Sequence, residues 1–115
     1  MSEADPDIET VAGLLEDRTV RTILTETSQE PMSANTLKER CEASGPTIYR
    51  RLERLREADF VVEGTRPDPE GGHHRTVYEP NLDRISIELA NGSLSVEITR
   101  REGMADRFTR LVEEM

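Results

Sequence analysis

The sequence predicts an α+β fold in which four short helices precede two β-hairpins and a final helix. Apolar residues recur every three to four positions through residues 8–60, which is the period of a helix with one buried face. Beyond Phe60 the period shortens to about two, which is typical of strands. Segments rich in turn-forming residues separate these stretches, and such regular patterning argues against a disordered chain.

The size of the chain restricts the fold to one domain, because 115 residues can build one modest core but not two. We expect a soluble, cytoplasmic protein, since no apolar run approaches the length of a membrane span and residues 1–7 lack the pattern of a signal peptide. The single cysteine, Cys41, excludes an intramolecular disulfide, which fits a reducing compartment.

The charge composition is unusual. Acidic residues number 24 against 15 basic ones, so that the net charge is −9, and Lys38 is the only lysine among fourteen arginines. This acidic, lysine-poor and aromatic-poor composition is similar to that of proteins from extreme halophiles, whose surface charge keeps them hydrated in concentrated salt. We favour a halophilic protein over an ordinary acidic one.

Two helices are expected near the N-terminal end, after a flexible segment at residues 1–7. Asp7 is a suitable N-cap for the first of them. Asp17 or a neighbour is expected to cap the second, at about residues 18–27. This second helix is expected to bury three aliphatic side chains, namely Val20, Ile23 and Leu24.

The next two helices are separated by a turn of about three residues. Ser33 is a suitable cap for the third helix, in which Leu37 and Cys41 lie on one face at i and i+4. The turn at residues 42–44 leads into a fourth helix at about residues 45–58. Two helices joined by so short a turn form a helix-turn-helix motif, in which the second helix reads DNA bases.

The helix at residues 45–58 has two faces of opposite chemistry. Ile48, Leu52 and Leu55 form an apolar stripe at i, i+4 and i+7. Residues 44–56 also carry four arginines and one glutamate, a local charge of +3. A cationic helix on an anionic protein predicts DNA binding. By contrast, the N-terminal 17 residues carry six acids and no base, so that end should face away from DNA.

A solvated helix face is the alternative explanation of this charge. Three pairs are spaced i, i+3 and can form ion pairs within the helix: Arg50–Glu53, Glu53–Arg56 and Arg54–Glu57. We expect these pairs to coexist with DNA binding in the free protein.

A first hairpin is expected directly after this helix. Residues 61–66 and 75–79 read as strands, and residues 67–74 between them are rich in turn formers. A hairpin packed behind a recognition helix is a wing, here at residues 61–79. The order of elements therefore predicts a winged helix-turn-helix domain over residues 8–80.

A second hairpin carries the clearest strand signal in the chain. Aliphatic and polar residues alternate on both sides of Asn91 and Gly92, a pair that favours a type I′ turn. Isolated hairpins are marginal in water, so we expect the apolar face to be covered. Six aliphatic side chains line that face: Ile85, Ile87, Leu89, Leu94, Val96 and Ile98.

The final helix is expected at about residues 104–114. Its apolar stripe can cover the second hairpin, pair with a second copy of the chain, or do both. We therefore predict that residues 81–115 form a dimerisation unit. The expected dimerisation residues are Met104, Phe108, Leu111 and Met115.

Residues 8–80 resemble the winged-helix domain of ArsR-like transcriptional regulators, in the form frequent in halophilic archaea. The similarity is greatest in residues 44–61, SGPTIYRRLERLREADFV, which resemble that family's recognition helix and the start of its wing. This resemblance implies core positions at Ile48, Leu52 and Leu55. It implies base or backbone contacts at Thr47, Tyr49, Arg50 and Arg51.

Two features depart from the simplest members of that family. The metal-sensing members carry paired cysteines, whereas Cys41 stands alone, so metal sensing is not implied. The hairpin at residues 85–98 is additional to the minimal domain, so the family's dimer and effector behaviour does not carry over.

We expect DNA contacts from the turn, the recognition helix and the wing. The planar fork of arginine suits guanine edges and phosphates, and a wing tip can reach the minor groove. The expected contacts are Ser44, Pro46, Thr47, Tyr49, Arg50, Arg51, Arg54, Arg66, His73, His74 and Arg75.

Other chemistry is weakly indicated. His73 and His74 lack a carboxylate or cysteine at ligand spacing, so an exposed loop or a DNA contact is favoured over a metal site. Cys41 is expected to be a small core residue rather than a redox switch. No catalytic constellation occurs, so we expect neither enzymatic activity nor a cofactor.

These inferences favour a homodimeric, sequence-specific transcriptional regulator that binds a pseudo-palindromic operator in double-stranded DNA. The first alternative is a winged-helix protein-interaction module of the transcription or replication machinery, without its own operator. The second is a small-ligand sensor with a pocket between the second hairpin and the last helix. The sequence does not identify an effector.

Overall fold

The computed structural model describes residues 5–67 and 74–101, which form four helices and four strands. In chain order these are α1 (Ile8–Glu16), α2 (Arg18–Thr27), α3 (Ala34–Cys41), α4 (Gly45–Glu57), β1 (Val61–Pro67), β2 (His74–Pro80), β3 (Leu82–Ala90) and β4 (Ser93–Arg100). The predicted α+β winged helix-turn-helix fold with an additional C-terminal hairpin is confirmed. The expected last helix, with Met104, Phe108, Leu111 and Met115, lies outside the described residues.

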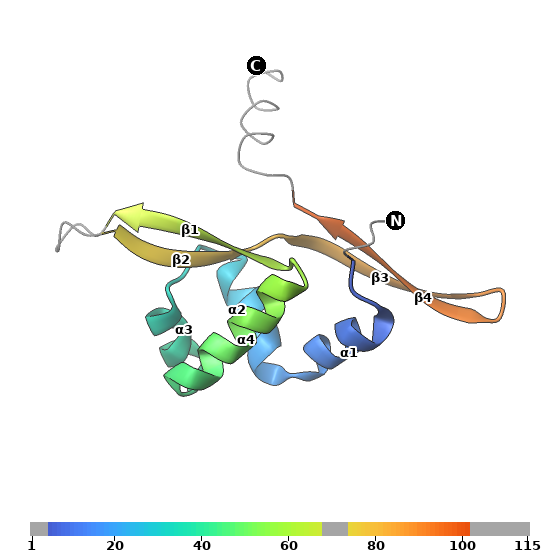
Figure 1. Cartoon of the computed structure of the whole chain (residues 1–115), viewed down its shortest axis with the longest axis horizontal. Coiled ribbons are helices and arrows are strands. Elements are labelled where there is room, and N and C mark those ends of the chain that lie inside the picture. Colours follow the sequence, from blue (N-terminus) through green and yellow to red (C-terminus); the bar gives the residue numbers. More distant parts are fainter. Residues whose placement is uncertain (1–4, 68–73, 102–115) are drawn as a thin grey trace, which may run out of the picture.

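The helices lie along one side of the molecule and the two hairpins form a long band along the other (Figure 1). The β1–β2 hairpin, which is the wing, runs beside α2, α3 and α4, whereas the β3–β4 hairpin runs beside α1 (Figure 1). The strands of the two hairpins extend in opposite directions from the middle of the band (Figure 1).

Each helix begins at a side chain that accepts a hydrogen bond from a backbone N–H of the first turn, which would otherwise lack a partner. In α1, α2, α3 and α4 respectively, the N-caps are Asp7, Asp17, Ser33 and Ser44, as the sequence predicts. Asp5 and Asp7 make defined contacts, although the segment that contains them was expected to be flexible. Residues 1–4 lie outside the described part.

Two helices end in a left-handed residue that is not glycine. In α4 this residue is Asp59, with φ 60°, and its N–H donates to the carbonyl of Arg56 at 2.9 Å. The next N–H, of Phe60, donates to the carbonyl of Leu55 at 2.9 Å, and both side chains are fully buried. This is a Schellman motif, which fixes the direction in which the chain leaves α4. Glu42, with φ 52°, ends α3 in the same way.

The core lies between the four helices and the base of the wing. Arg21 also ties α2 to the end of α1, because its Nη1 donates to the carbonyls of Leu15 and Glu16. Leu24, which was expected to be buried, is half-buried and packs at the edge of the core. The largest fully buried apolar side chains are Phe60, Leu14, Ile23, Leu37, Ile48, Leu52, Leu55, Val11 and Val20.

The wing is joined to the helices by backbone hydrogen bonds. Met32, just before α3, forms a β-bridge with Tyr78 of β2. The N–H of Met32 donates to the carbonyl of Tyr78 at 3.1 Å, and the N–H of Tyr78 donates to the carbonyl of Met32 at 2.8 Å. Both side chains are buried. The base of the wing is therefore part of the core, while its outer half is exposed.

The second hairpin turns at Asn91 and Gly92, whose φ angles of 54° and 76° fit the predicted type I′ turn. The cross-strand pairs Ile85–Ile98, Ile87–Val96 and Leu89–Leu94 place all six aliphatic side chains on one face. Half of this face packs against the core, and the half nearest the turn is exposed. The packed residues are Ile85, Val96 and Ile98, and the exposed ones are Ile87, Leu89 and Leu94.

Neighbouring substitutions in α4 should test this packing. Ile48→Ala removes a fully buried side chain and should lower the free energy of unfolding by about 2–5 kcal/mol. Tyr49→Ala, one residue later and 59% exposed, should change it by less than about 0.5 kcal/mol. Urea denaturation measures both values, and equal losses would contradict the assignment of the buried face.

Candidate nucleic-acid interface

The turn between α3 and α4 is held by hydrogen bonds at both ends. The N–H of Ala43 donates to the carbonyl of Lys38 at 3.1 Å, which closes the end of α3. The Ser44 Oγ accepts from the N–H of Thr47 at 3.3 Å and lies 3.0 Å from its hydroxyl. Pro46 occupies the first turn of α4, where no N–H is needed. The angle between the two helices is thus set by local contacts.

The outer face of α4 follows from the burial of its inner face. Ile48, Leu52 and Leu55 are buried, and the residues on the opposite side are exposed. That opposite side carries Pro46, Arg50, Glu53 and Glu57 at i, i+4, i+7 and i+11, with Tyr49 beside them. The N-terminal half of this face, with Tyr49 and Arg50, is what the helix offers to a groove.

Arg51 and Arg54 are oriented differently from Arg50. The Arg51 Nε lies 2.5 Å from the Asp17 Oδ2, and the Arg54 Nη1 lies 3.6 Å from the same oxygen. The side chains of Arg51 and Arg54 are 27% and 43% exposed. Both expected DNA contacts therefore lean toward the corner between α1 and α2, and Arg51 is the more enclosed of the two.

Asp17 contacts both of these arginines and also caps α2. Its Oδ1 accepts from the N–H groups of Thr19 and Val20 at 2.9 and 3.2 Å, which caps α2, while its Oδ2 faces the arginines of α4. Burial favours the neutral carboxyl, but the N–H of Val20 and the Arg51 guanidinium outweigh it and lower the pKa of Asp17. The sequence indicated the cap but gave no sign that α4 is anchored there.

The ion pairs of α4 are mostly not the expected i, i+3 pairs. Arg54 is paired with Asp17, and the Arg56 Nη1 binds the Glu63 Oε1 of β1 at 2.9 Å. The second pair ties the end of α4 to the wing. Glu53 is exposed on the outer face beside Arg50, so this face carries the one carboxylate that the sequence analysis counted with the four arginines.

The wing places three expected contacts near its tip. Arg66 and Arg75 are cross-strand partners, His74 pairs with Pro67, and all four residues are exposed. These ends of β1 and β2 lie beyond α3, at the end of the molecule where α4 begins (Figure 1). His73, the remaining expected contact, lies outside the described residues.

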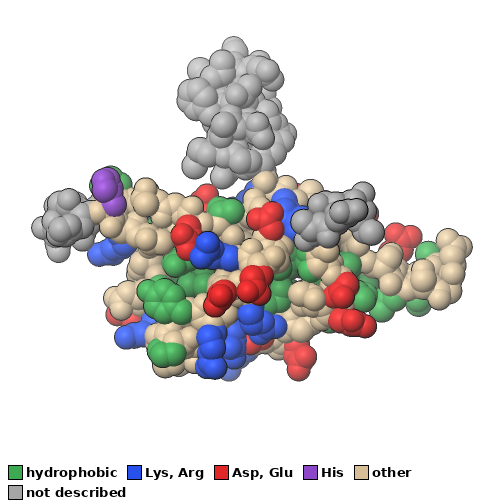
Figure 2. Space-filling model, viewed as in Figure 1, with side chains coloured by type: hydrophobic (Ala, Val, Ile, Leu, Met, Phe, Trp, Pro, Cys, Tyr) green, Lys and Arg blue, Asp and Glu red, His purple; other side chains and the backbone are tan. Residues whose placement is uncertain are grey.

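Positive charge gathers over the helix-turn-helix. Figure 2 shows Lys and Arg side chains at the lower edge of the molecule, where Figure 1 places α4, with Asp and Glu side chains directly beside them. The acidic N-terminal end is not remote from α4, because Asp17 pairs with Arg51 and Arg54.

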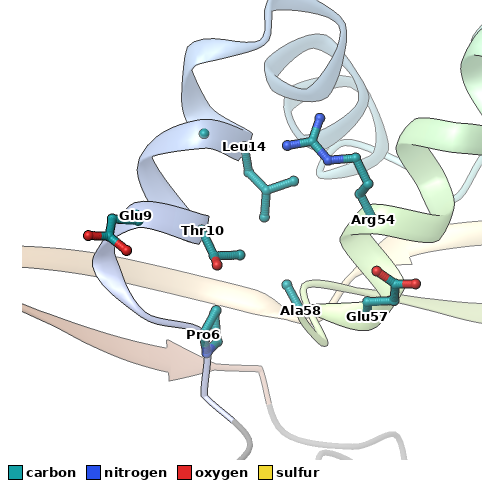
Figure 3. Close-up of a pocket in the computed structure, with 8 residues that line it drawn as sticks. Pro6, Glu9, Thr10, Leu14, Arg54, Glu57 and Ala58 are labelled. Atoms are coloured by element: carbon teal, nitrogen blue, oxygen red, sulfur yellow. The ribbon is translucent and has the colours of Figure 1, made fainter.

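A shallow pocket of about 310 Å³ lies between α1 and α4 (Figure 3). Thr10 and Leu14 enter it from α1, and Arg54 and Glu57 border it from α4 (Figure 3). Arg54, which borders this pocket, is also the residue of α4 that lies 3.6 Å from Asp17.

Cys41 is half-buried and packs against the core, in keeping with a small core residue. Burial, and then the nearby Glu26 carboxylate, raise the pKa of the Cys41 thiol, which disfavours the reactive thiolate. In the described part of the chain, no group of three His, Cys, Asp or Glu side chains is placed to hold a metal ion. No helix there is long and apolar enough to cross a bilayer.

Comparison with known proteins agrees with this geometry. Residues 15–64 match the family model of a helix-turn-helix domain, and this range spans α2, α3, α4 and the start of β1. No curated protein matches the chain. The match supports a DNA-binding regulator in general terms.

Asp17→Asn should test how α4 is anchored, because it keeps a cap acceptor but removes the charge that holds Arg51. The pKa of Asp17 is lowered by folding from its usual value of 3.8, so the ionised carboxylate stabilises the fold at any pH above 3.8. This contribution is lost as the pH falls through the pKa of the folded state. The free energy of unfolding of the variant should therefore be lower than that of wild type by about 1–2 kcal/mol at neutral pH. This difference should become smaller in acid.

Urea denaturation over a descending pH series measures this gap. Glu16→Gln, which removes the exposed neighbouring charge, is the matched control and should show little difference at any pH. A gap for Asp17→Asn that stays constant from neutral to acid pH would contradict the charge-based anchor.

Proposed function

We propose that this protein is a homodimeric, sequence-specific transcriptional regulator of the ArsR-like type, adapted to the cytoplasm of a halophilic archaeon. The observation that carries the proposal is the outer face of α4, where Tyr49 and Arg50 are exposed at the N-terminal half while the apolar stripe is buried. The helix-turn-helix match supports DNA binding in general. The acidic, lysine-poor composition supports the halophilic origin.

In this proposal α4 enters the major groove by its N-terminal half. Arg50 donates to a guanine edge, and Thr47 or Tyr49 packs against thymine methyl groups. Glu53, on the same exposed face, accepts from the amino group of a cytosine. Ser44 and Pro46 lie at the end of the helix that approaches the DNA backbone first.

Arg51 and Arg54 take a secondary part. Both are held by Asp17, so contact with a phosphate requires Arg54, the more exposed of the two, to leave its 3.6 Å pairing. Arg51 sits deeper and contributes mainly by orienting α4. The wing residues Arg66, His73, His74 and Arg75 contact flanking DNA.

Salt makes close contacts necessary. If about four phosphates are bound, raising the salt from roughly 0.15 M to roughly 3 M weakens binding by about 10⁴–10⁵-fold. A regulator working in concentrated salt therefore depends on base contacts more than on long-range attraction. The few exposed arginines of α4, in a chain of net charge −9, agree with a larger share for base contacts.

The second hairpin is proposed as a dimerisation element, together with residues 102–115. The side chains of Ile87, Leu89 and Leu94 are 53%, 78% and 55% exposed, and the strand register places them on one face of the hairpin. A two-fold dimer buries such a patch against its own copy. The apolar stripe of Met104, Phe108, Leu111 and Met115 adds to the same interface.

The same exposed patch favours one other function. A protein-interaction module of the transcription or replication machinery would use Leu89 and Leu94 to bind a different protein, without an operator of its own. The two functions differ in solution, because a dimerisation patch is covered without any partner protein.

Arg50→Ala should weaken binding to a duplex selected from a random pool by about 1–3 kcal/mol, and weaken binding to random duplexes much less. Arg84→Ala, at an exposed arginine on β3, is the control for loss of one charge. Fluorescence anisotropy at high salt measures both. An equal loss on selected and random DNA would refute base reading by Arg50.

Leu89→Lys should produce monomers in analytical ultracentrifugation, whereas Glu88→Lys, on the opposite face of the same strand, should leave the dimer intact. Deleting residues 102–115 should also weaken the dimer. A Leu89→Lys variant that sediments as the wild-type dimer would remove the hairpin from the interface.

A further inference from the structure

The side chain of Arg100, the last residue of β4, makes more hydrogen bonds and ion pairs than any other side chain in the described part of the chain. Its Nε donates to the carbonyl of Asp59 at 2.9 Å, and its Nη2 donates to the carbonyl of Ala58 at 2.9 Å. Its Nη1 binds the Asp5 Oδ1 at 2.5 Å, and the guanidinium carbon lies 5.9 Å from the centre of the Phe60 ring. The side chain is only 20% exposed.

The position of these acceptors explains why an arginine stands there. Ala58 is the C-cap of α4, and the carbonyls at a helix C-terminus lack partners and carry partial negative charge. A planar guanidinium can donate to two neighbouring carbonyls and a carboxylate at once, which the compact ammonium of lysine cannot do in the same geometry. Asp5 balances the charge that the contact partly buries.

Arg100 completes a two-point attachment of the hairpin to the end of α4. On the β3 side, Asn81 donates its N–H to the Phe60 carbonyl at 2.8 Å and its Nδ2 to the Asp59 carbonyl at 3.2 Å. On the β4 side, Arg100 holds the adjacent carbonyls. Ile85, Val96 and Ile98 pack one half of the hairpin face against the core, and the attachment of both strands at the base further restricts the direction in which the exposed half points.

We propose that Arg100 is a positioning residue that fixes the direction of the β3–β4 hairpin relative to α4, and thereby the separation of the two recognition helices in the dimer. The second half of this statement rests on the proposed function, in which the hairpin joins two subunits and α4 reads DNA. Dimers read half-sites about one helical turn apart, so the angle between these elements determines which spacing is accepted.

The first test measures the angle without DNA. Spin labels are placed on α4 and on the hairpin through Glu53→Cys and Glu88→Cys in a Cys41→Ser background, and labelled protein is diluted with unlabelled protein. Electron–electron resonance gives the distance distribution. Wild type should give one narrow distance, and Arg100→Gln and Arg100→Lys should each give a broader one, while circular dichroism reports that the variants are folded.

Arg100→Lys keeps a positive charge beside the helix end and is the variant to rely on if Arg100→Gln does not fold. Arg84→Gln, at an exposed arginine near the base of the same hairpin, is the matched control and should leave the distribution narrow. Distributions for the Arg100 variants as narrow as that of wild type would overturn the proposal.

The second test compares two DNA probes: the duplex that wild type selects from a random pool, and the same duplex with one half-site scrambled. Arg100→Lys should lose about tenfold or more in affinity on the full duplex and less than about threefold on the scrambled one, because misplaced subunits cannot engage both half-sites together. An equal loss on both probes would reduce Arg100 to a general structural role and overturn the proposal.

These outcomes separate the two claims. A wild-type protein that selects no duplex contradicts the proposed function, and the spin-label distances still decide whether Arg100 sets the hairpin direction. A selected duplex combined with unchanged distances contradicts the role of Arg100 alone.

Discussion

Burial of one stripe of α4 is the constraint on which the rest of the structure depends. Ile48, Leu52 and Leu55 are inaccessible to solvent, and removing any of them would leave a cavity among four helices. Because a helix turns 100° per residue, this burial fixes the direction of every other side chain on α4. Tyr49 and Arg50 must face outward, and Arg51 must lie beside the core edge, where Asp17 meets it.

Several arginines in the described part of the chain make short-range contacts that join its elements. Arg21 caps the end of α1, Arg51 joins α4 to the corner of α1 and α2, Arg56 joins α4 to the wing, and Arg100 joins α4 to the second hairpin. Such contacts combine charge with directed hydrogen bonds at close distance, so salt screens them less than it screens attraction across the surface. An acidic protein with fourteen arginines and one lysine is suited to this use.

Local signals in the sequence predicted most of the fold. The four N-caps, the Asn91–Gly92 turn and the change of period after Phe60 each act over a few residues, and all appear in the structure at the expected places. What joins these elements was not predictable, because the partners are distant along the chain. Spacing suggested Arg54–Glu57 as an ion pair, yet Arg54 binds Asp17 instead. Arg100 and Asp5 are 95 residues apart, and no periodicity relates them.

In the candidate site too, local patterns were predictable from the sequence and contacts between distant residues were not. The amphipathic pattern of α4 was sufficient to place Arg50 on the outer face, but only the tertiary structure distinguishes it from Arg51 and Arg54. In the proposed function, Arg50 and Tyr49 supply specificity while the anchored arginines hold the helix in position.

Footprinting on the genomic DNA of the source organism at the salt concentration of its cytoplasm tests the central claim most directly. The account predicts discrete protected sites that share two inverted half-sites about one helical turn apart. Even protection over unrelated DNA, or no protection at high salt, would contradict sequence reading by α4.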